Sequence, residues 1–181
     1  MKIKQFKEKI DFPEDVTVST TTSVVTVKGK NGEVSKEFKM PRFVLSTEGN
    51  SLVVECKNYN VYDKRNFLTV KAHVNNLIKG AQEGFEYKLK ICSSHFPMNV
   101  SVKGNKLVVK NLLGEKVPRE LVLKEGADVK LEGTVIVVKG NNIDTVSTVA
   151  SDIEQLTRIT NRDRRIFQDG IYITHKAGKE V

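Results

Sequence analysis

The sequence has no tryptophan, two cysteines and four prolines among its 181 residues. Two cysteines, Cys56 and Cys92, are too few for a disulfide scaffold, so we expect reduced thiols in a reducing compartment. No uncharged run is longer than the twelve residues of Val16–Val27, much of it Thr and Ser, whereas a membrane-spanning helix needs about 20 apolar residues. Met1–Lys7 is too charged for the apolar core of a secretory signal. These features argue against membrane, secreted and disulfide-rich proteins.

Valine is abundant instead, with 25 copies, which favours strands over a helical bundle. Apolar residues make up 39% of the chain and charged residues 29%, a balance that supports a packed core rather than disorder. At about 150 residues per domain, the length allows one medium domain or two small ones. Composition alone therefore predicts a strand-rich folded protein.

Basic residues outnumber acidic ones by 30 to 22, which gives a formal net charge of +8. Such an excess indicates a polyanionic partner, most often nucleic acid. Five of the seven arginines follow residue 92, and arginine binds phosphate through two hydrogen bonds at once, which lysine does not. The second half of the chain is therefore the part expected to bind the polyanion.

The chain repeats itself at an offset of 82 to 84 residues. Three pairs of segments carry the repeat: Val16–Val18 with Val100–Val102, Gly32-Glu33 with Gly114-Glu115, and Val53-Val54 with Val137-Val138. Their constant order and spacing predict two copies of one unit of roughly 85 residues. We assign residues 1–92 to the first repeat and residues 93–181 to the second, with the boundary anywhere in 82–96.

Each copy is expected to form strands, then a helix, then a strand. The segments typical of strands are Val24–Val27 and Val34–Phe38 around the turn Asn31-Gly32, then Met98–Val102 with Leu107–Val109, Leu121–Leu123 and Thr134–Val138. The segment 84–92 could close the first sheet or run on into the second. The predicted fold class is α+β, with two tandem similar domains from an internal duplication, each a small, mostly antiparallel sheet with one helix packed on it.

Two segments have apolar residues at helical spacing. The first has Phe67, Val70, Val74, Leu77 and Ile78, with Gly80 as its predicted end, and the second has Ile143, Val146, Val149, Ile153 and Leu156 behind a cap at Asn141 or Asn142. We expect Val149, Ile153 and Leu156 to face the sheet of the second domain, because the intervening Ser151, Asp152 and Gln155 are polar.

Candidate catalytic and metal-binding residues are sparse. Cys92 and His95 make half of a zinc site, which needs four ligands, so we interpret them as a partly buried thiol and a surface or stacking imidazole. Gly29–Gly32 has the spacing of a phosphate-clamping RNA loop, but it joins two expected strands, which favours a hairpin turn. Asp163 and Asp169 are candidate metal ligands of an RNA-processing enzyme, and pairing with neighbouring arginines is the favoured alternative. We expect no catalysis, no metal and no cofactor.

The densest cluster of positive charge is the arginine segment, residues 158–170, which follows the second helix and contains Arg158, Arg162, Arg164 and Arg165. A solvated, salt-bridged helix end would explain it, but the basic charge of the whole chain favours phosphate contact. Lysines of the neighbouring hairpin and the residues beyond it would extend the same surface.

Not every side chain of this segment can point outward. Ile166 and Phe167 are expected to reach the core. Arg165 is expected either to face a phosphate or to pair with Asp163 or Asp169 and hold the loop in shape.

The arginine segment also resembles a known family. The matching residues are Gln155, Ile159, Arg162, Arg165, Phe167, Asp169–Ile173 and Lys176, and their spacing resembles the C-terminal signature of the archaeal and eukaryotic branch of universal large-subunit ribosomal protein six, called large-subunit protein nine in eukaryotes. Weaker matches are Val27–Gly29 with Gly32, His95–Pro97 with Asn99-Val100, Leu113–Lys116 and Gly140–Ile143. The resemblance spans about Pro13 to Lys176, although this chain has Asn58–Tyr62 where eukaryotic relatives carry a Trp-containing stretch.

The resemblance implies a structural constituent of the large ribosomal subunit, built from two duplicated domains and located in the cytoplasm, in the ribosome. It implies that the second domain binds large-subunit rRNA near the stalk base and the loop contacted by translation GTPases. The partners would be large-subunit rRNA, neighbouring large-subunit proteins and translation GTPases nearby, with no membrane and no homo-oligomer. A basic RNA-binding protein outside the ribosome is the alternative. The expected rRNA-binding residues are Arg158, Arg162, Arg164, Arg165, Lys176, Lys103, Lys106, Lys110, Lys116 and Arg119.

Overall fold

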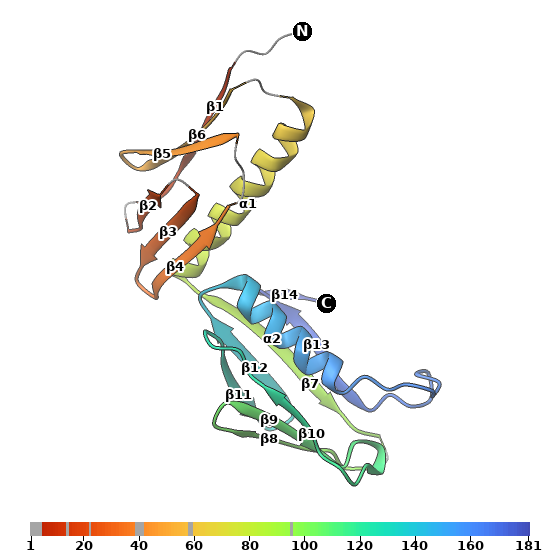
Figure 1. The fold of residues 1–181 in the computed structure, drawn as a ribbon. Helices are drawn as coiled ribbons and strands as arrows, with labels where there is room; N and C mark the ends of the chain where they lie inside the picture. Colours follow the sequence, from red (N-terminus) through yellow and green to blue (C-terminus); the bar gives the residue numbers. More distant parts are fainter. Residues whose placement is uncertain (1–4, 14, 22, 39–41, 58–59, 95) are drawn as a thin grey trace. The chain divides into compact units, whose positions relative to one another are not determined.

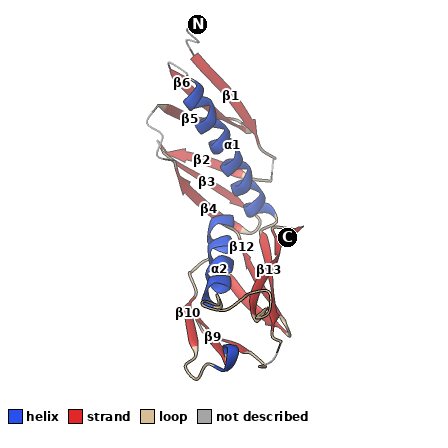
Figure 2. Ribbon diagram, turned by 90° about the vertical axis from the view of Figure 1, so that its right-hand side faces the viewer, coloured by secondary structure: helices blue, strands red, loops and turns tan. Residues whose placement is uncertain are grey.

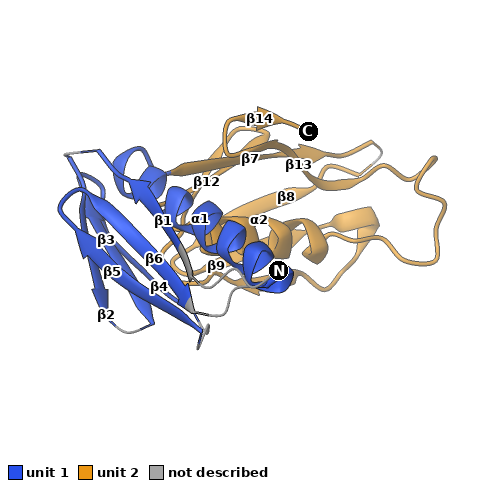
Figure 3. Cartoon of the chain, turned by 90° about the horizontal axis from the view of Figure 1, so that it is seen from above, with its two compact units in different colours: residues 1–84 blue, residues 85–181 orange. Residues whose placement is uncertain are grey.

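The computed structural model describes residues 5–13, 15–21, 23–38, 42–57, 60–94 and 96–181 (Figure 1). The chain divides into two compact units, residues 1–84 and residues 85–181 (Figure 3). Each unit combines antiparallel sheets with one α-helix (Figure 2), which confirms the predicted α+β class. Within the described residues, neither α-helix is long and apolar enough to cross a membrane.

The first unit contains two three-stranded antiparallel sheets, with the strand orders β2-β3-β4 and β1-β6-β5. Its elements are β1 Gln5–Asp11, β2 Thr17–Thr21, β3 Val24–Gly29, β4 Gly32–Glu37, β5 Phe43–Glu48, β6 Ser51–Lys57 and α1 Val61–Gln82. The apolar residues predicted to line one face of the helix are all buried in the core of this unit. The helix therefore packs as its sequence pattern indicates.

Asn60 begins α1 through a pair of reciprocal hydrogen bonds. Its side-chain oxygen accepts from the backbone N–H of Asp63 at 2.9 Å, and the Asp63 carboxylate accepts from the backbone N–H of Asn60 at 3.0 Å. This capping box satisfies two N–H groups that a helix start leaves open. Part of the divergent stretch 58–62 thus starts a helix, while Asn58 and Tyr59 lie outside the described residues.

The predicted end of the helix at Gly80 is wrong. Gly80 is buried inside the last turn, and the helix continues to Gln82 with Glu83 as its C-cap. Gly84 follows with a φ of +76°, a left-handed conformation that glycine adopts without strain. The second glycine of this stretch, rather than the first, therefore ends the helix.

Gly29–Gly32 is a hairpin turn, as predicted. Gly29 and Gly32 pair across β3 and β4, and a Cβ on Gly29 would lie 2.6 Å from the carbonyl oxygen of Ala81. Asn31 donates from its backbone to that same oxygen at 3.0 Å and from its side chain to the carbonyl of Gln82 at 3.1 Å. The turn thus supplies donors to carbonyl groups that the end of α1 leaves open.

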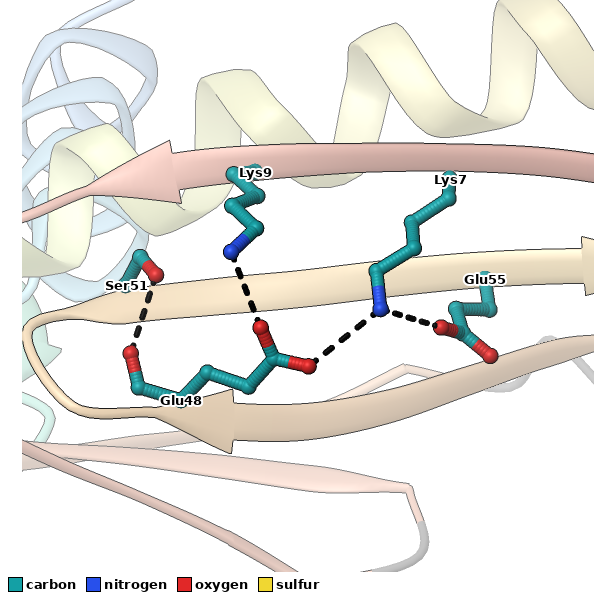
Figure 4. Close-up of polar contacts among 5 residues, drawn as sticks. All are labelled: Lys7, Lys9, Glu48, Ser51 and Glu55. Atoms are coloured by element: carbon teal, nitrogen blue, oxygen red, sulfur yellow. Dashed lines mark hydrogen bonds and ion pairs between the residues drawn. The ribbon is translucent and has the colours of Figure 1, made fainter.

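One face of the β1-β6-β5 sheet carries charges of both signs (Figure 4). The Lys7 amine lies 2.9 Å from Glu55 and 3.2 Å from Glu48, and the Lys9 amine lies 2.9 Å from Glu48. These hydrogen bonds raise the pKa of Lys7 and lower the pKa of Glu48. Because the four charges balance, this face has little net attraction for a polyanion.

The second unit contains a three-stranded sheet of order β10-β9-β8 and a five-stranded sheet of order β11-β12-β7-β13-β14. Its elements are β7 Phe85–Cys92, β8 Asn99–Lys103, β9 Lys106–Lys110, the 3₁₀ turn η1 Leu112–Gly114, β10 Arg119–Val122, β11 Asp128–Glu132, β12 Val135–Gly140, α2 Ile143–Leu156, β13 Gly170–Lys176 and β14 Lys179–Glu180. Each copy of the repeat therefore has a three-stranded sheet, β2-β3-β4 or β8-β9-β10, and a second sheet that contains the first strand of the copy, β1 or β7.

Strand β7 lies at the boundary between the two units and has features of both repeats. It follows α1 in the chain as β13 follows α2, yet it pairs with β12 as β1 pairs with β6. It also pairs with β13, so the segment runs on into the second sheet. The division between the units falls between Gly84 and Phe85, before this strand instead of after residue 92, and inside the range 82–96.

The second helix packs against β7, β12 and β13. Its N-cap is Asn142, whose side chain accepts from the backbone N–H of Asp144 at 2.9 Å. Val149 and Ile153 are buried, and Leu156 packs partly buried against the same core. The predicted buried face of this helix is confirmed.

The Arg119 clamp, formed by Arg119, Glu115 and the carbonyl groups of Leu156 and Arg158, joins the three-stranded sheet to the end of α2. The Arg119 guanidinium donates to the Glu115 carboxylate at 2.9 and 2.5 Å. It also donates to the carbonyl oxygens of Leu156 at 2.8 Å and Arg158 at 3.2 Å. A cation is favourable at a helix C-terminus. Here the Arg119 guanidinium also holds the backbone at the start of the arginine segment.

We predict that limited digestion with a glutamate-specific protease cuts first after Glu83. Glu83 is exposed at the C-cap of α1, whereas Glu86 lies in a central strand and pairs with Lys88 and Lys139, which makes it the internal control. Mass spectrometry of the early fragments should find one protected half on each side of Glu83. First cuts within residues 100–138 would show that the halves do not fold separately.

The Ile153→Ala substitution should lower the free energy of unfolding by about 2–5 kcal/mol, because it empties a fully buried site in the core. Ser151 is exposed on the same helix, so Ser151→Ala is the control and should change stability by less than about 0.5 kcal/mol. Urea denaturation followed by circular dichroism measures both. A similar small loss for both variants would contradict the packing described here.

Glu115→Gln should destabilise the protein at neutral pH and lose this effect in acid. The hydrogen bond from Arg119 lowers the pKa of Glu115 below the ordinary value of about 4.3. A carboxyl with a lowered folded pKa contributes stability that is complete above the unfolded pKa and is lost as pH falls through the folded one. Melting temperatures of the variant and the unsubstituted chain should therefore converge as pH falls through the lowered pKa of the folded state.

The control for this experiment is Glu120→Gln, which removes the exposed partner of Lys106 and should have a small effect near neutral pH. A Glu115→Gln deficit that stays constant in acid would show that the clamp does not depend on the ionised carboxylate.

Candidate nucleic-acid interface

The arginine segment forms a loop between α2 and β13 that projects beyond the sheet (Figures 1 and 3). Two buried side chains fix the base of the loop. The Thr157 hydroxyl accepts from the backbone N–H of Ile171 at 2.9 Å. The Asp169 carboxylate accepts from the backbone N–H and, at 3.1 Å, from the hydroxyl of Ser94. The ends of the loop are therefore anchored while its arginines are exposed.

Arg165 pairs with Asp163, one of the two partners predicted for it. Its Nη2 lies 2.7 Å from the carboxylate, which also accepts from the Arg165 backbone N–H at 2.9 Å. These hydrogen bonds lower the pKa of Asp163 and give the turn its shape. Because Asp163 binds Arg165 and Asp169 binds Ser94, the two carboxylates do not form a shared site.

Metal-binding clusters are absent from the residues that the structure describes, since no three His, Cys, Asp or Glu side chains gather there. His95, the second member of the half zinc site, lies outside the described residues.

Arg162 is held by an aromatic ring. Its guanidinium carbon lies 4.8 Å from the centre of the Phe167 ring, within the range of a cation–π contact. Phe167 is half-buried, but Ile166 is 72% exposed, so the prediction that Ile166 reaches the core is wrong. The reason is the turn at 163–167, in which the backbone N–H groups of Ile166 and Phe167 both donate to the Asp163 carbonyl and Ile166 is left on the outside.

Arg158 and Arg164 are both exposed, and in the described part of the chain their guanidinium groups have no hydrogen bond or ion pair. They are therefore the two arginines of the loop with the most N–H groups open to a ligand. Arg165 is also 90% exposed despite its ion pair, so its charge contributes to the same surface.

The other predicted cations divide into a group near the start of the arginine segment and a group far from it. Lys110 follows Val109, which pairs with Arg119 of the clamp, and Lys116 follows Glu115, so both are near the start of the loop. Lys103 and Lys106 pair with each other at the opposite end of the β8–β9 hairpin, roughly 13 Å farther along at about 3.3 Å per residue. Lys106 also pairs with Glu120 at 3.4 Å.

Arg119 and Lys176 do not join the exposed cluster. The clamp occupies four of the five N–H groups of Arg119, which makes it a positioning residue for the loop. Lys176 pairs in register with Tyr87 and Lys179 at the far end of β13, roughly 20 Å along the strand from Gly170.

A cleft of about 790 Å³ lies beside the loop, lined by Cys92, Arg162–Arg165, Gln168 and Tyr172. Tyr172 is 39% exposed, and exposed Lys90 lies directly opposite it on β7. Burial raises the pKa of the Tyr172 hydroxyl, Cys92 adds to the rise and Arg164 opposes it, so the hydroxyl is neutral at physiological pH.

Sequence reasoning missed Tyr172, Gln168 and Lys90. The signal that could have found Tyr172 is its place between Ile171 and Ile173 on one strand, because alternation puts it on the opposite face from its apolar neighbours.

Comparison with known proteins gives matches over nearly the whole chain. The family model described as "Ribosomal protein L6" matches twice, over residues 12–84 and 96–170. The large ribosomal subunit protein uL6 of Haloarcula marismortui is 39% identical over 171 residues, which are 94% of this chain and 96% of that protein. Protein uL6 of Methanococcus vannielii is 42% identical over 177 residues, with 96% and 95% covered. Protein uL6 of Natronomonas pharaonis is 39% identical over 168 residues, with 93% and 95% covered.

The double match of one family model confirms the duplication. The identity to archaeal relatives confirms the archaeal and eukaryotic branch of the family indicated by the arginine segment. Together with the fold, these matches show that the chain belongs to the ribosomal protein L6 family and is a structural constituent of the ribosome, not an enzyme.

Proposed function

We propose that this ribosomal protein, in the cytoplasm, binds large-subunit rRNA through the arginine segment of its second unit. The observation that carries the proposal is an anchored loop whose Arg158 and Arg164 guanidinium groups are open, with Arg162 and Arg165 held beside them. Guanidinium groups bind phosphate through paired hydrogen bonds. A loop that is shaped before binding loses less conformational entropy on contact.

The location proposed for this contact is near the stalk base and the rRNA loop contacted by translation GTPases. The support is the resemblance of the arginine segment and of four shorter stretches to the family signature. Neighbouring large-subunit proteins and translation GTPases are the further partners that such a location implies.

Of the cations named from sequence, the structure favours a subset as phosphate ligands. Arg158, Arg162, Arg164 and Arg165 lie in the loop, and Lys110 and Lys116 lie near its start. Arg119 is proposed to act through the clamp, and Lys103, Lys106 and Lys176 are proposed as remote contributors to the overall positive charge.

The double substitution Arg162→Ala and Arg164→Ala should weaken binding of the full chain to its cognate rRNA fragment. Each lost phosphate contact flattens the slope of log affinity against log salt by roughly 0.7–0.9, so the pair should reduce it by about 1.5. The melting temperature of the free protein should fall by no more than about 2–4 °C, because an exposed cation–π contact contributes less than about 1 kcal/mol.

The control is the double substitution Lys103→Ala and Lys106→Ala, which removes the same formal charge at the far end of the hairpin. It should lower the slope by less than the arginine pair. If the arginine variant binds normally at every salt concentration and the lysine variant does not, the arginine segment is only a solvated helix end and the hairpin is the rRNA contact.

The location has a separate test. Sucrose-gradient fractionation in high salt should find the protein with large subunits, and hydroxyl-radical footprinting of those subunits should find protection at the stalk base that the arginine variant reduces. Protein that stays at the top of the gradient would favour an RNA-binding role outside the ribosome.

A further inference from the structure

The cleft beside the arginine segment contains an aromatic ring that phosphate binding alone does not use. We propose that this cleft binds one nucleotide whose base has left the helical stack, with the base against the Tyr172 ring and its phosphate near Arg164 and Lys90. The proposal rests on the proposed function, since it requires that RNA reach the second unit, and it names the class of RNA feature that is recognised: an unpaired, extruded nucleotide rather than a continuous duplex.

The size of the cleft suits a nucleotide. Its volume of about 790 Å³ lies within the range of roughly 300–1,000 Å³ found for small-ligand sites. A base inside a duplex has both faces covered by its neighbours, so only a base in a loop, bulge or end can place a face on an aromatic side chain. A flat duplex surface would leave this cleft empty.

The backbone directs the Tyr172 ring toward the arginine segment. A Cβ on Gly170 would lie 3.2 Å from the Tyr172 hydroxyl oxygen and 3.3 Å from two of its ring carbons, so the ring leans over the backbone of Gly170. Gly170 is the end of β13 nearest the loop, and its φ of +154° is one that other residues rarely adopt. The absence of a side chain there leaves the space that the ring occupies.

Two cations lie near the ring. Lys90 lies directly opposite Tyr172 in the β7–β13 pairing, where cross-strand Cβ atoms are about 5 Å apart. Arg164 lines the same cleft and is close enough to lower the pKa of the Tyr172 hydroxyl. An aromatic face with cations nearby is the combination that single-stranded nucleic-acid sites use, because the ring stacks on the base and the cations attract the adjoining phosphates.

Gln168 supplies polar groups at the wall of the cleft. Its side-chain amide donates to the carbonyl oxygen of Arg165 at 3.3 Å. The amide keeps one further hydrogen and its carbonyl oxygen for the edge of a base. The cleft thus offers stacking, charge and hydrogen bonding within one strand end and one loop.

The binding test uses the full chain and a fluorescently labelled, short single strand of oligo(rA), followed by anisotropy over a range of salt concentrations. Tyr172→Ala should weaken binding by about 5- to 150-fold, the usual effect of losing one base stack, without changing the salt slope, because no phosphate contact is removed. Tyr172→Phe keeps the ring and should bind within about twofold of the unsubstituted chain. Tyr172→Val also removes the ring but keeps strand propensity. It should weaken binding by a similar factor, and it replaces the alanine variant in the test if that variant folds poorly.

The matched control is Tyr62→Ala, because Tyr62 is 71% exposed on α1 of the first unit and does not line the cleft. It should leave oligo(rA) binding unchanged. A mixed-sequence RNA duplex of the same nucleotide count is the ligand control, and its affinity should not respond to Tyr172→Ala.

Cys92 provides an independent readout, because its thiol lines the cleft whereas Cys56 is only 2% exposed and burial raises the pKa of its thiol. Alkylation of Cys92 should slow in the presence of oligo(rA) and not in the presence of the duplex. Mass spectrometry of the modified peptides distinguishes the two thiols.

The proposal is overturned if Tyr172→Ala and Tyr172→Val bind oligo(rA) as well as the unsubstituted chain, if the duplex loses as much affinity as the single strand, or if oligo(rA) leaves Cys92 alkylation unchanged. In those cases a salt slope that still depends on Arg162 and Arg164 would leave the proposed rRNA contact intact and remove only the nucleotide site. If the salt slope also no longer depends on Arg162 and Arg164, the results contradict both the nucleotide site and the proposed rRNA contact.

Discussion

The antiparallel pairing of β7 with β13 is the contact on which the second unit depends. It sets Gly170 opposite Cys92 and Tyr172 opposite Lys90, and it brings Ser94 within reach of the Asp169 carboxylate. Because side chains alternate across a strand, the same register sends Ile171 into the core and Tyr172 to the opposite face. A shift of one residue would exchange these faces and expose the core residue.

The arginines of the second unit differ in how much of each guanidinium the fold uses. Arg119 is committed to the clamp, Arg165 shares its charge with Asp163, Arg162 rests on Phe167, and Arg158 and Arg164 face solvent. This division has a physical basis, because an exposed loop needs internal contacts to hold a shape and open donors to hold a ligand. The internally bonded arginines therefore position the others.

The two copies of the repeat share their order of elements and most of their strand pairing, and they differ in the strand that follows the helix. In each copy a hairpin and a third strand precede a second hairpin and a helix. Strand β13 follows α2 and pairs within the second unit. Strand β7 follows α1 but pairs with β12 and β13, so it belongs to the five-stranded sheet of the second unit and not to a sheet of the first. The loop before this last strand also differs, since only two residues separate α1 from β7, whereas the arginine segment lies before β13.

Much of this fold could be predicted from local patterns. The duplication follows from segments that match at a constant offset along the chain. The buried faces of the helices and a cap at Asn141 or Asn142 follow from hydrophobic spacing and capping chemistry, which depend on neighbours within a few residues. The basic loop could also be located, because its charge density is a property of the sequence itself. The end of α1 was misplaced by two residues, since two glycines with the same propensity lie close together and only packing buries the first.

The sequence by itself thus determined that there are two copies, where their helices face the core and where positive charge gathers. Only the tertiary structure decided which sheet receives β7, which arginines are open and which hold the loop, and that Tyr172 lies beside them. The physical reason is distance along the chain. Arg119 meets the carbonyl of Leu156 across 37 residues and Ser94 meets Asp169 across 75. Such contacts leave no periodic pattern in the sequence, because they join residues that are far apart along the chain.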